Sequence, residues 1–194
     1  MDYTLQQTHV FARWHASLHD LRARIAIARR LEPAAAGNLG DVKALGGELC
    51  EMRVAIGAGY RIYFIRRGTW LIILRHGATR PPRQPISIRP GPWQRSFDMA
   101  GTLVPFDMAT LLDNDEAISE YLSQVLADGD TDELLRALGH VARARGMAQV
   151  SRDSGLGRAS LYKTFAPGAK PRFDTVVKVM RALGIQLRTH VTHG

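Results

Sequence analysis

Several side chains in the C-terminal third of the chain suit contact with a nucleic acid. Arg158 carries a planar guanidinium that can donate two hydrogen bonds to one guanine edge, whereas Ser160 and Lys163 suit contacts to phosphates or bases. We predict base and phosphate contacts from five neighbouring residues: Arg158, Ala159, Ser160, Tyr162 and Lys163. Three more residues are placed for the flanking DNA backbone: Gln149, Arg152 and Lys170.

These side chains must project from a helix, and the surrounding sequence predicts one. The predicted elements are a helix ending at Gly146, a short helix over 147–154, the turn Gly155-Leu156-Gly157, a helix over 158–165 and a closing helix over 173–183. Two helices joined by a short glycine-containing turn form the helix-turn-helix plan, whose second helix enters the major groove of DNA. The alternative interpretation is a helical packing element whose basic face is only solvated.

The end of the chain suggests a dimer. The run IQLRTHV (185–191) alternates and predicts a strand, which could pair with its copy in a second chain. A monomeric helix-turn-helix grips one half-site only, so a homodimer is expected. His190 and His193 flank this run, and we interpret them as a frayed end with no metal site.

Charge is sorted along the chain. Residues 1–98 carry 15 Lys/Arg against 7 Asp/Glu, residues 99–133 carry nine acids and no base, and residues 134–194 carry eleven bases against two acids. This order predicts a basic module, an acidic segment able to cover it, and a second basic module that faces a polyanion. With one cysteine, no apolar run of membrane-span length and no recognisable signal peptide, a cytoplasmic protein without membrane contact is expected.

One long stretch of the chain closely resembles the antidote proteins of HigA-like addiction modules. It reads FDMATLLDNDEAISEYLSQVLADGDTDELLRALGHVARARGMAQVSRDSGLGRASLYKTF (106–165). The resemblance continues through TVVKVMRALGIQL and covers nearly all of 103–191. It implies binding to operator DNA and contact with a partner toxin. The chain departs from the family pattern at Ser151, at Gly157 and at Ala169-Lys170; glycine is an accepted N-cap, so DNA binding is still expected.

The N-terminal half predicts a small α+β domain. Apolar residues from Phe11 to Ile25 step by three and four, which indicates two helices broken near His19-Asp20, the second ending before Pro33. Strand-like runs follow, separated by glycine-containing turns: ELCEMRVAI (48–56), YRIYFI (60–65) and TWLIIL (69–74). The predicted fold is an α+β domain of two helices and an antiparallel sheet (1–76), a Pro/Arg-rich linker (77–102) and an all-α helix-turn-helix domain (103–194).

The N-terminal half resembles the HigB-type toxins of the RelE/ParE superfamily, in their phage-derived subgroup. The resemblance spans about residues 8–75 and includes the stretch GNLGDVKALGGELCEMRVAIGAGYRIYF (37–64). Most such toxins are ribosome-dependent mRNA endoribonucleases that need no metal or cofactor, because basic residues stabilise the charge of the scissile phosphate. The resemblance implies phosphate binding by Arg53 and Arg61, RNA guidance by Lys43, and stacking or proton transfer by Tyr63 or Tyr60. In the alternative interpretation, Glu51 pairs with Arg53 across the sheet and the tyrosines only pack.

The segment between the two halves departs from the toxin pattern. These toxins carry a Gly-Asp-Lys-x-x-Gln tail after the last strand, whereas this chain reads RHGATRPPRQPISIRPGPWQR (75–95), with five of the nine prolines and no acid. Possible codons for this segment, when read in the frame that begins two nucleotides later, can encode the peptide R-G-D-K-A-T-Q-A-A-D-I-D, which fits the toxin tail. We hypothesise that this segment is a frame-shifted toxin tail that reads through into the antidote, whose own start would be Met99.

Three functions follow from the two resemblances. The first is a fused toxin–antitoxin protein that represses its own promoter, with toxin–antidote contact within or between chains. The second is a DNA-binding regulator with an inert toxin remnant. The third is an active endoribonuclease, disfavoured because a tethered antidote cannot be degraded separately. A gyrase target for the toxin half stays open as well.

Overall fold

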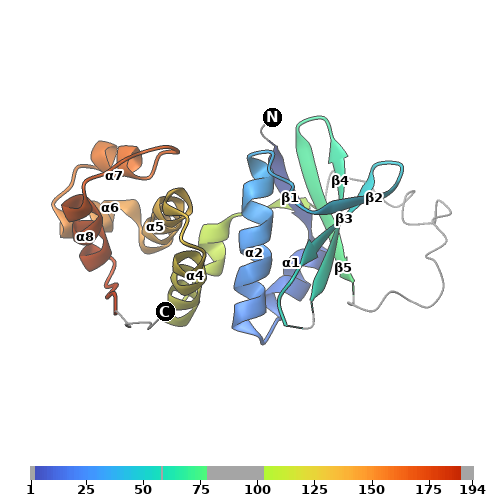
Figure 1. The fold of residues 1–194 in the computed structure, drawn as a ribbon, viewed down its shortest axis with the longest axis horizontal. Helices are drawn as coiled ribbons and strands as arrows, with labels where there is room; N and C mark the ends of the chain where they lie inside the picture. Colours follow the sequence, from blue (N-terminus) through green and yellow to red (C-terminus); the bar gives the residue numbers. More distant parts are fainter. Residues whose placement is uncertain (1–2, 58, 78–102, 189–194) are drawn as a thin grey trace, which may run out of the picture. The chain divides into compact units, whose positions relative to one another are not determined.

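The computed structural model describes residues 3–57, 59–77 and 103–188, with side chains omitted for 75–77, and the chain forms two compact units, Met1–Met108 and Ala109–Gly194 (Figure 1). The first unit is α+β and the second is all-helical, which confirms the predicted fold class. The segment interpreted as a frame-shifted tail lies almost wholly outside the described residues, as do His190 and His193. No helix in the described ranges is long and apolar enough to cross a membrane.

A six-stranded sheet forms the centre of the first unit. Its strand order is β2-β3-β4-β5-β1-β6, and all neighbours run antiparallel except β1 and β5, which are parallel. The predicted meander is confirmed as β3, β4 and β5, whereas β1, β2 and β6 were not predicted. The strands are β1 (Thr4–Thr8), β2 (Val42–Gly46), β3 (Leu49–Val54), β4 (Tyr60–Arg67), β5 (Trp70–Gly77) and β6 (Leu103–Pro105).

Two helices, α1 (His9–Ala16) and α2 (Leu21–Ala35), belong to the same unit. Each begins at a side-chain cap: Thr8 Oγ1 accepts from the amide of Phe11 at 3.2 Å, and Asp20 Oδ1 accepts from that of Ala23 at 3.1 Å. The predicted break near His19-Asp20 is thus confirmed. The predicted end before Pro33 is wrong, because α2 continues through Pro33 to Ala35. The proline removes one amide donor, yet the helix continues, with Leu31 and Ala34 on either side of it buried in the core.

Both helices contribute to a core on one face of the sheet. Phe11 of α1 and Ile27 and Leu31 of α2 are fully buried there, beside alternate residues of β3 and β4 such as Met52 and Phe64. The opposite face has a smaller apolar cluster of three buried residues: Ile65, Ile72 and Leu74. Because side chains alternate along a strand, the residues of β3 and β4 that do not enter the main core project from this second face.

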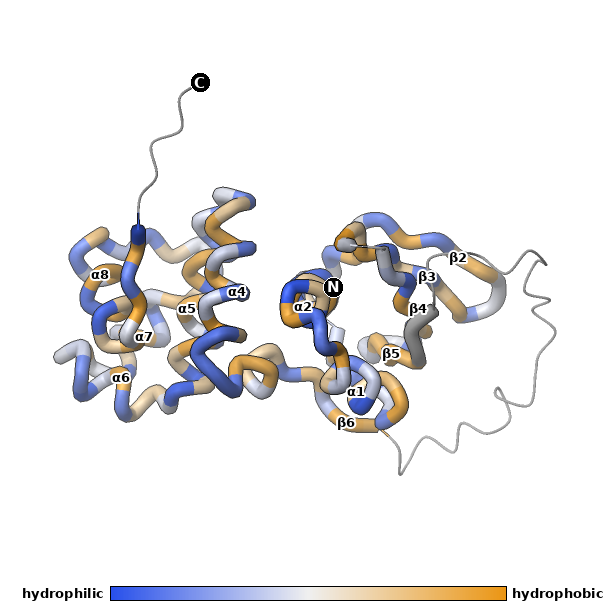
Figure 2. Tube along the Cα trace, turned by 90° about the horizontal axis from the view of Figure 1, so that it is seen from below, coloured by the Kyte–Doolittle hydropathy of each residue, from blue (hydrophilic) through white to orange (hydrophobic). Residues whose placement is uncertain are grey.

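The second unit is built from a 3₁₀ turn and five helices: Met108–Leu111, α4 (Asp115–Asp128), α5 (Thr131–Arg145), α6 (Met147–Ser154), α7 (Arg158–Thr164) and α8 (Phe173–Ala182). The helices predicted over 147–154, 158–165 and 173–183, and the helix end at Gly146, are confirmed to within a residue. The tube in Figure 2 alternates between orange and blue along α4 and α5, as expected for helices that bury one face. The described part of the predicted C-terminal strand, 185–188, has no regular structure.

The acidic segment has a local structural role in this unit. Asp115 and Glu116 lie in the first turn of α4, and Asp132 and Glu133 lie in the first turn of α5. The α5 cap, Asp130, accepts hydrogen bonds from the amides of both first-turn acids, at 2.8 and 3.1 Å. Negative charge at a helix N-terminus is favourable, so positions at the starts of α4 and α5 account for much of the acidic run that was predicted to be able to cover a basic module.

Candidate functional site

The turn between α6 and α7 fixes the position of α7. Gly155 ends α6 with φ of +68°, a left-handed conformation that favours glycine. The hydroxyl of Ser151 donates to the carbonyl of Leu156 at 2.7 Å, and the hydroxyl of Ser154 accepts from the Leu156 amide at 3.3 Å. The side chain of Ser151 therefore stabilises the turn.

Helix α7 buries one face and exposes the other. Leu161 is fully buried and Thr164 is buried with its hydroxyl bound to the carbonyl of Ser160 at 2.9 Å. All five residues predicted to contact bases or phosphates are exposed. In the described part of the chain, the side chains of Arg158 and Lys163 take part in no hydrogen bond or ion pair. The cationic groups of α7 are therefore available to a polyanion.

The two α6 residues predicted to contact the DNA backbone, Gln149 and Arg152, are exposed, but their side chains form hydrogen bonds within α6. Gln149 Nε2 donates to both carboxylate oxygens of Asp153, at 2.7 and 2.8 Å, and Arg152 donates to Gln149 Oε1. Asp153 was not among the predicted site residues, although an acid one turn after Gln149 on a helix signals such a pair. Its negative charge offsets the positive charge of Arg152 on the same helix. Lys170 is exposed in the segment between α7 and α8.

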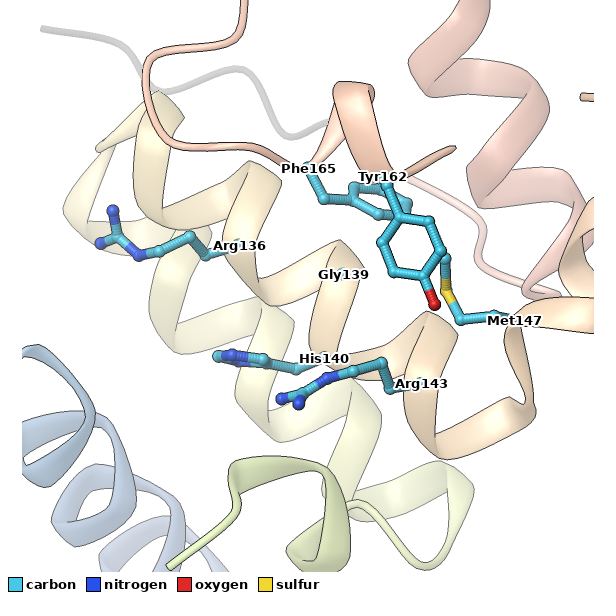
Figure 3. Close-up of a pocket in the computed structure, with 7 residues that line it drawn as sticks. All are labelled: Arg136, Gly139, His140, Arg143, Met147, Tyr162 and Phe165. Atoms are coloured by element: carbon cyan, nitrogen blue, oxygen red, sulfur yellow. The ribbon is translucent and has the colours of Figure 1, made fainter. Parts of the chain in front are cut away.

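A pocket of about 290 Å³ lies where α5 meets α6 and α7 (Figure 3). Phe165 packs closely over Gly139, since a Cβ atom at residue 139 would lie 3.0 Å from the Cβ atom of Phe165. Tyr121 fixes the ring of His140 through a contact of 2.9 Å between its hydroxyl and Nδ1. Tyr162 lines the pocket and remains 60% exposed, so its ring is shared between this pocket and the predicted DNA face.

Four of the five predicted toxin residues share the second face of the sheet. Glu51 pairs in register with Lys43 on β2 and with Tyr63 on β4, and Arg53 pairs with Arg61. Directly opposite residues lie on the same face, so Lys43, Arg53, Arg61 and Tyr63 are brought together. We call these four residues with Glu51 the basic sheet face. Tyr60 is not part of it: this residue packs against the main core, with its ring centroid 6.1 Å from that of Trp14.

A buried carboxylate neutralises part of the basic sheet face. Glu51 Oε1 accepts from Arg61 Nη1 at 2.6 Å and from Arg53 Nε at 3.2 Å, and its side chain is only 5% exposed. Burial acts to raise the pKa of Glu51, but the hydrogen bonds from Arg61 and Arg53 outweigh it and hold this pKa below its ordinary value. The same hydrogen bond raises the pKa of Arg61. Two guanidinium groups thus face one carboxylate, which leaves one excess positive charge.

Replacing Glu51 by glutamine should destabilise the first unit by about 1–3 kcal/mol at pH 7, because two charge-assisted hydrogen bonds are weakened. The pKa of Glu51 is lowered on folding, so its contribution is present above the unfolded value of about 4.3 and is lost as pH falls through the lower folded value. The difference between the two proteins should therefore shrink as pH falls below about 4.3. Trp14 on α1 and Trp70 on β5 belong to this unit, so urea unfolding followed by tryptophan fluorescence reports on it. A difference that stays constant from pH 7 to pH 3 would contradict the assignment.

Comparison with known proteins places the C-terminal half in a family. Residues 102–191 match the family model described as a probable addiction module antidote protein. An uncharacterized protein of Haemophilus influenzae is 42% identical over 90 residues, which cover 46% of this chain and 93% of that protein. A second uncharacterized protein of the same organism is 32% identical over 80 residues, covering 41% of this chain and 81% of that protein.

No solved structure gives a significant match to the chain. The family model does not extend into residues 1–101, so the resemblance of that half to toxins remains a prediction. The matched segment includes α4 to α8 and the glycine turn that positions α7, as the antidote resemblance implied. Through residues 102–191, this chain belongs to the family of probable addiction module antidote proteins.

Proposed function

We propose that this protein is a fused toxin–antidote protein whose antidote half binds operator DNA through α7 and represses its own promoter. The observation that carries the proposal is the exposed, cationic face of α7, with Arg158 and Lys163, held on a glycine turn inside the antidote family segment. The protein acts in the cytoplasm as a homodimer, because two copies of α7 can reach two half-sites of a palindromic operator.

A promoter fusion tests the regulatory function in cells. DNA from immediately upstream of the coding sequence is placed before a reporter gene, and the intact chain is supplied from a second plasmid. Repression by the intact chain, and its loss on replacing Arg158 by alanine, is the expected result. Equal reporter levels with and without the protein would contradict the proposal.

The N-terminal half is the toxin part of the proposal. The basic sheet face provides Arg53, Arg61 and Lys43 for an RNA phosphate and Tyr63 for stacking or proton transfer, on mRNA at the ribosome. Toxin–antidote contact within the fused chain keeps this activity silent. A second candidate function, a DNA-binding regulator with an inert toxin remnant, is favoured by one observation: Glu51 already pairs with both phosphate-binding arginines.

Growth of cells that express residues 1–108 alone separates the two candidates. This fragment retains β6, which a fragment ending at residue 98 would lack. Growth arrest by the fragment and not by the intact chain supports a silenced toxin, and replacing Arg61 by alanine should then relieve the arrest. Normal growth with a soluble, folded fragment supports the inert remnant. The variant Arg66→Ala, an exposed arginine on the same strand, is the matched control.

A further inference from the structure

The first described residues of the antidote segment form part of the N-terminal domain. The family match begins at residue 102, yet β6 (Leu103–Pro105) is the edge strand of the sheet and falls within the first compact unit. We infer that residues 103–106 of the antidote segment dock on the edge of β1 in their own chain and so join the two halves at that edge. A role of this contact in silencing the toxin rests on the proposed toxin–antidote function.

Backbone pairing and side-chain packing both support the docking. Gln6, Gln7 and Thr8 of β1 lie opposite Pro105, Val104 and Leu103, in that order. The pairing continues past β6, where the amide of Phe106 donates to the carbonyl of Leu5 at 3.2 Å. Leu103 packs against the apolar cluster of the second sheet face, whereas Phe106 packs against the main core under the helices. The segment thus contacts both faces of the sheet.

The position of the strand ends supports docking within one chain. Strand β5 runs parallel to β1 and ends at Gly77, three residues past Leu74, and the hydroxyl of Thr8 donates to the Leu74 carbonyl at 2.6 Å. Leu103 lies opposite the same Thr8, so the chain leaves β5 and enters β6 at the same end of the sheet. Strands β5 and β6 flank β1 and are therefore about 10 Å apart. The roughly 25 residues of 78–102 have ample reach for that connection.

The docked segment does not reach the basic sheet face. In the strand order, β5 and β1 separate β6 from β4, and β3 and β2 lie further away. At about 4.8 Å between neighbouring strands, β6 is about 14 Å from the strand that carries Arg61. This segment therefore anchors the antidote without itself covering the predicted phosphate-binding residues.

Pro105 makes β6 the last strand of the sheet. Ladder bonds of an antiparallel pair alternate, so the hydrogen-bonded pair Leu5–Phe106 places Gln6–Pro105 at a non-hydrogen-bonded position. The backbone nitrogen of Pro105 then faces away from β1. Because proline has no amide proton, this outer edge lacks a donor that a further strand would need.

A disulfide across the β1–β6 pair tests docking in the intact chain. Cysteines at both Gln6 and Pro105 would lie opposite each other with Cα atoms about 4.5 Å apart, within disulfide range. Under mild oxidation we expect a disulfide within one chain. The protein should then migrate as a single chain on a non-reducing gel, and neither new cysteine should react with a thiol reagent. The control pair, Gln7→Cys with Pro105→Cys, places its side chains on opposite faces and should not cross-link.

Two results would overturn the inference: no more disulfide than in the control pair, or a disulfide that links two chains. The single variant Gln6→Cys checks that the native Cys50, which is buried, does not react. Hydrogen exchange in the unaltered chain gives a second measurement, since the Gln7 amide should be protected only while β6 is docked; rapid exchange would overturn the inference too. Neither readout involves DNA or growth, so failure of the proposed function leaves both unchanged.

Discussion

Replacing Arg158 by alanine is expected to weaken binding of the intact chain to operator DNA by roughly 5- to 150-fold, or about 1–3 kcal/mol. Arg158 is the first residue of α7 and is exposed, and its side chain makes no hydrogen bond or ion pair with the described part of the chain. Its guanidinium therefore approaches a guanine edge without first breaking a bond within the protein. Fluorescence anisotropy with a labelled operator duplex, at one fixed salt concentration, measures the loss.

The matched control is Arg66→Ala, which removes the same charge from an exposed site on β4 in the other unit. This change should leave operator affinity within a factor of about two. Lys163→Ala should instead weaken binding to all DNA sequences alike. It should also lower the slope of log affinity against log salt concentration by about one, the value for one lost phosphate contact. Unchanged affinity of Arg158→Ala for the operator would show that α7 is not the helix that reads bases.

Replacing Leu161 by alanine is expected to destabilise the helical unit by about 2–5 kcal/mol. Leu161 is fully buried and is the apolar residue of α7 that turns toward the interior of this unit, whereas its neighbours Tyr162 and Lys163 are exposed. The substitution removes three carbon atoms and leaves a cavity in a small helical unit. Loss of ellipticity at 222 nm on heating or in urea measures the effect.

Lys163→Ala on the same helix is the control and should change stability by less than about 0.5 kcal/mol. Tryptophan fluorescence gives an internal control, because Trp14 and Trp70 lie in the first unit and the sequence has no tryptophan after residue 93. The fluorescence transition should stay in place while the helical transition shifts. Equal stability of Leu161→Ala and Lys163→Ala would contradict the packing of α7.

Local signals in the sequence were sufficient for α5 to α8, whereas α4 was not predicted and the expected strand over 185–191 has no regular structure in its described part. Apolar spacing placed α5, and Gly146 and Gly155 fixed the ends of α5 and α6, because both adopt positive φ angles that other residues disfavour. Gly157 instead begins α7 as its N-cap, in an ordinary extended conformation. The same reasoning failed at Pro33, because α2 continues past the proline to Ala35, with Leu31 and Ala34 on either side of it packed in the core. That packing depends on residues far away in the sequence.

Strand pairing was predictable only between neighbours in the chain. The meander of β3, β4 and β5 follows from runs joined by short turns, whereas β1 and β6 meet across nearly a hundred residues. Strand β1 is short and largely polar, TLQQT, and β6 has three residues, so neither carries a periodic signal of its own. The placement of the antidote segment at the sheet edge therefore emerged only from the three-dimensional structure.

Residue types in the sequence indicated most of the candidate sites, but not which acidic side chains pair with the predicted site residues. The exposed cations of α7 and the shared face of Arg53, Arg61, Lys43 and Tyr63 agree with the alternation and helical spacing in the sequence. Two acids change what these surfaces can do: Asp153 engages Gln149, and Glu51 binds both arginines of the sheet. The Glu51–Arg53 pair stood as an alternative at the level of sequence, whereas the closer partner, Arg61, is set by cross-strand register.

Binding of the intact chain to DNA from immediately upstream of its own coding sequence is the measurement that decides most. Anisotropy titrations would compare this duplex with a scrambled duplex of the same length and base composition, each over a range of salt concentrations. We predict that the upstream duplex binds at least about 1,000-fold more tightly at physiological salt and that Arg158→Ala reduces this preference. Equal affinity for the two duplexes would contradict operator recognition and leave α7 as a basic, solvated face.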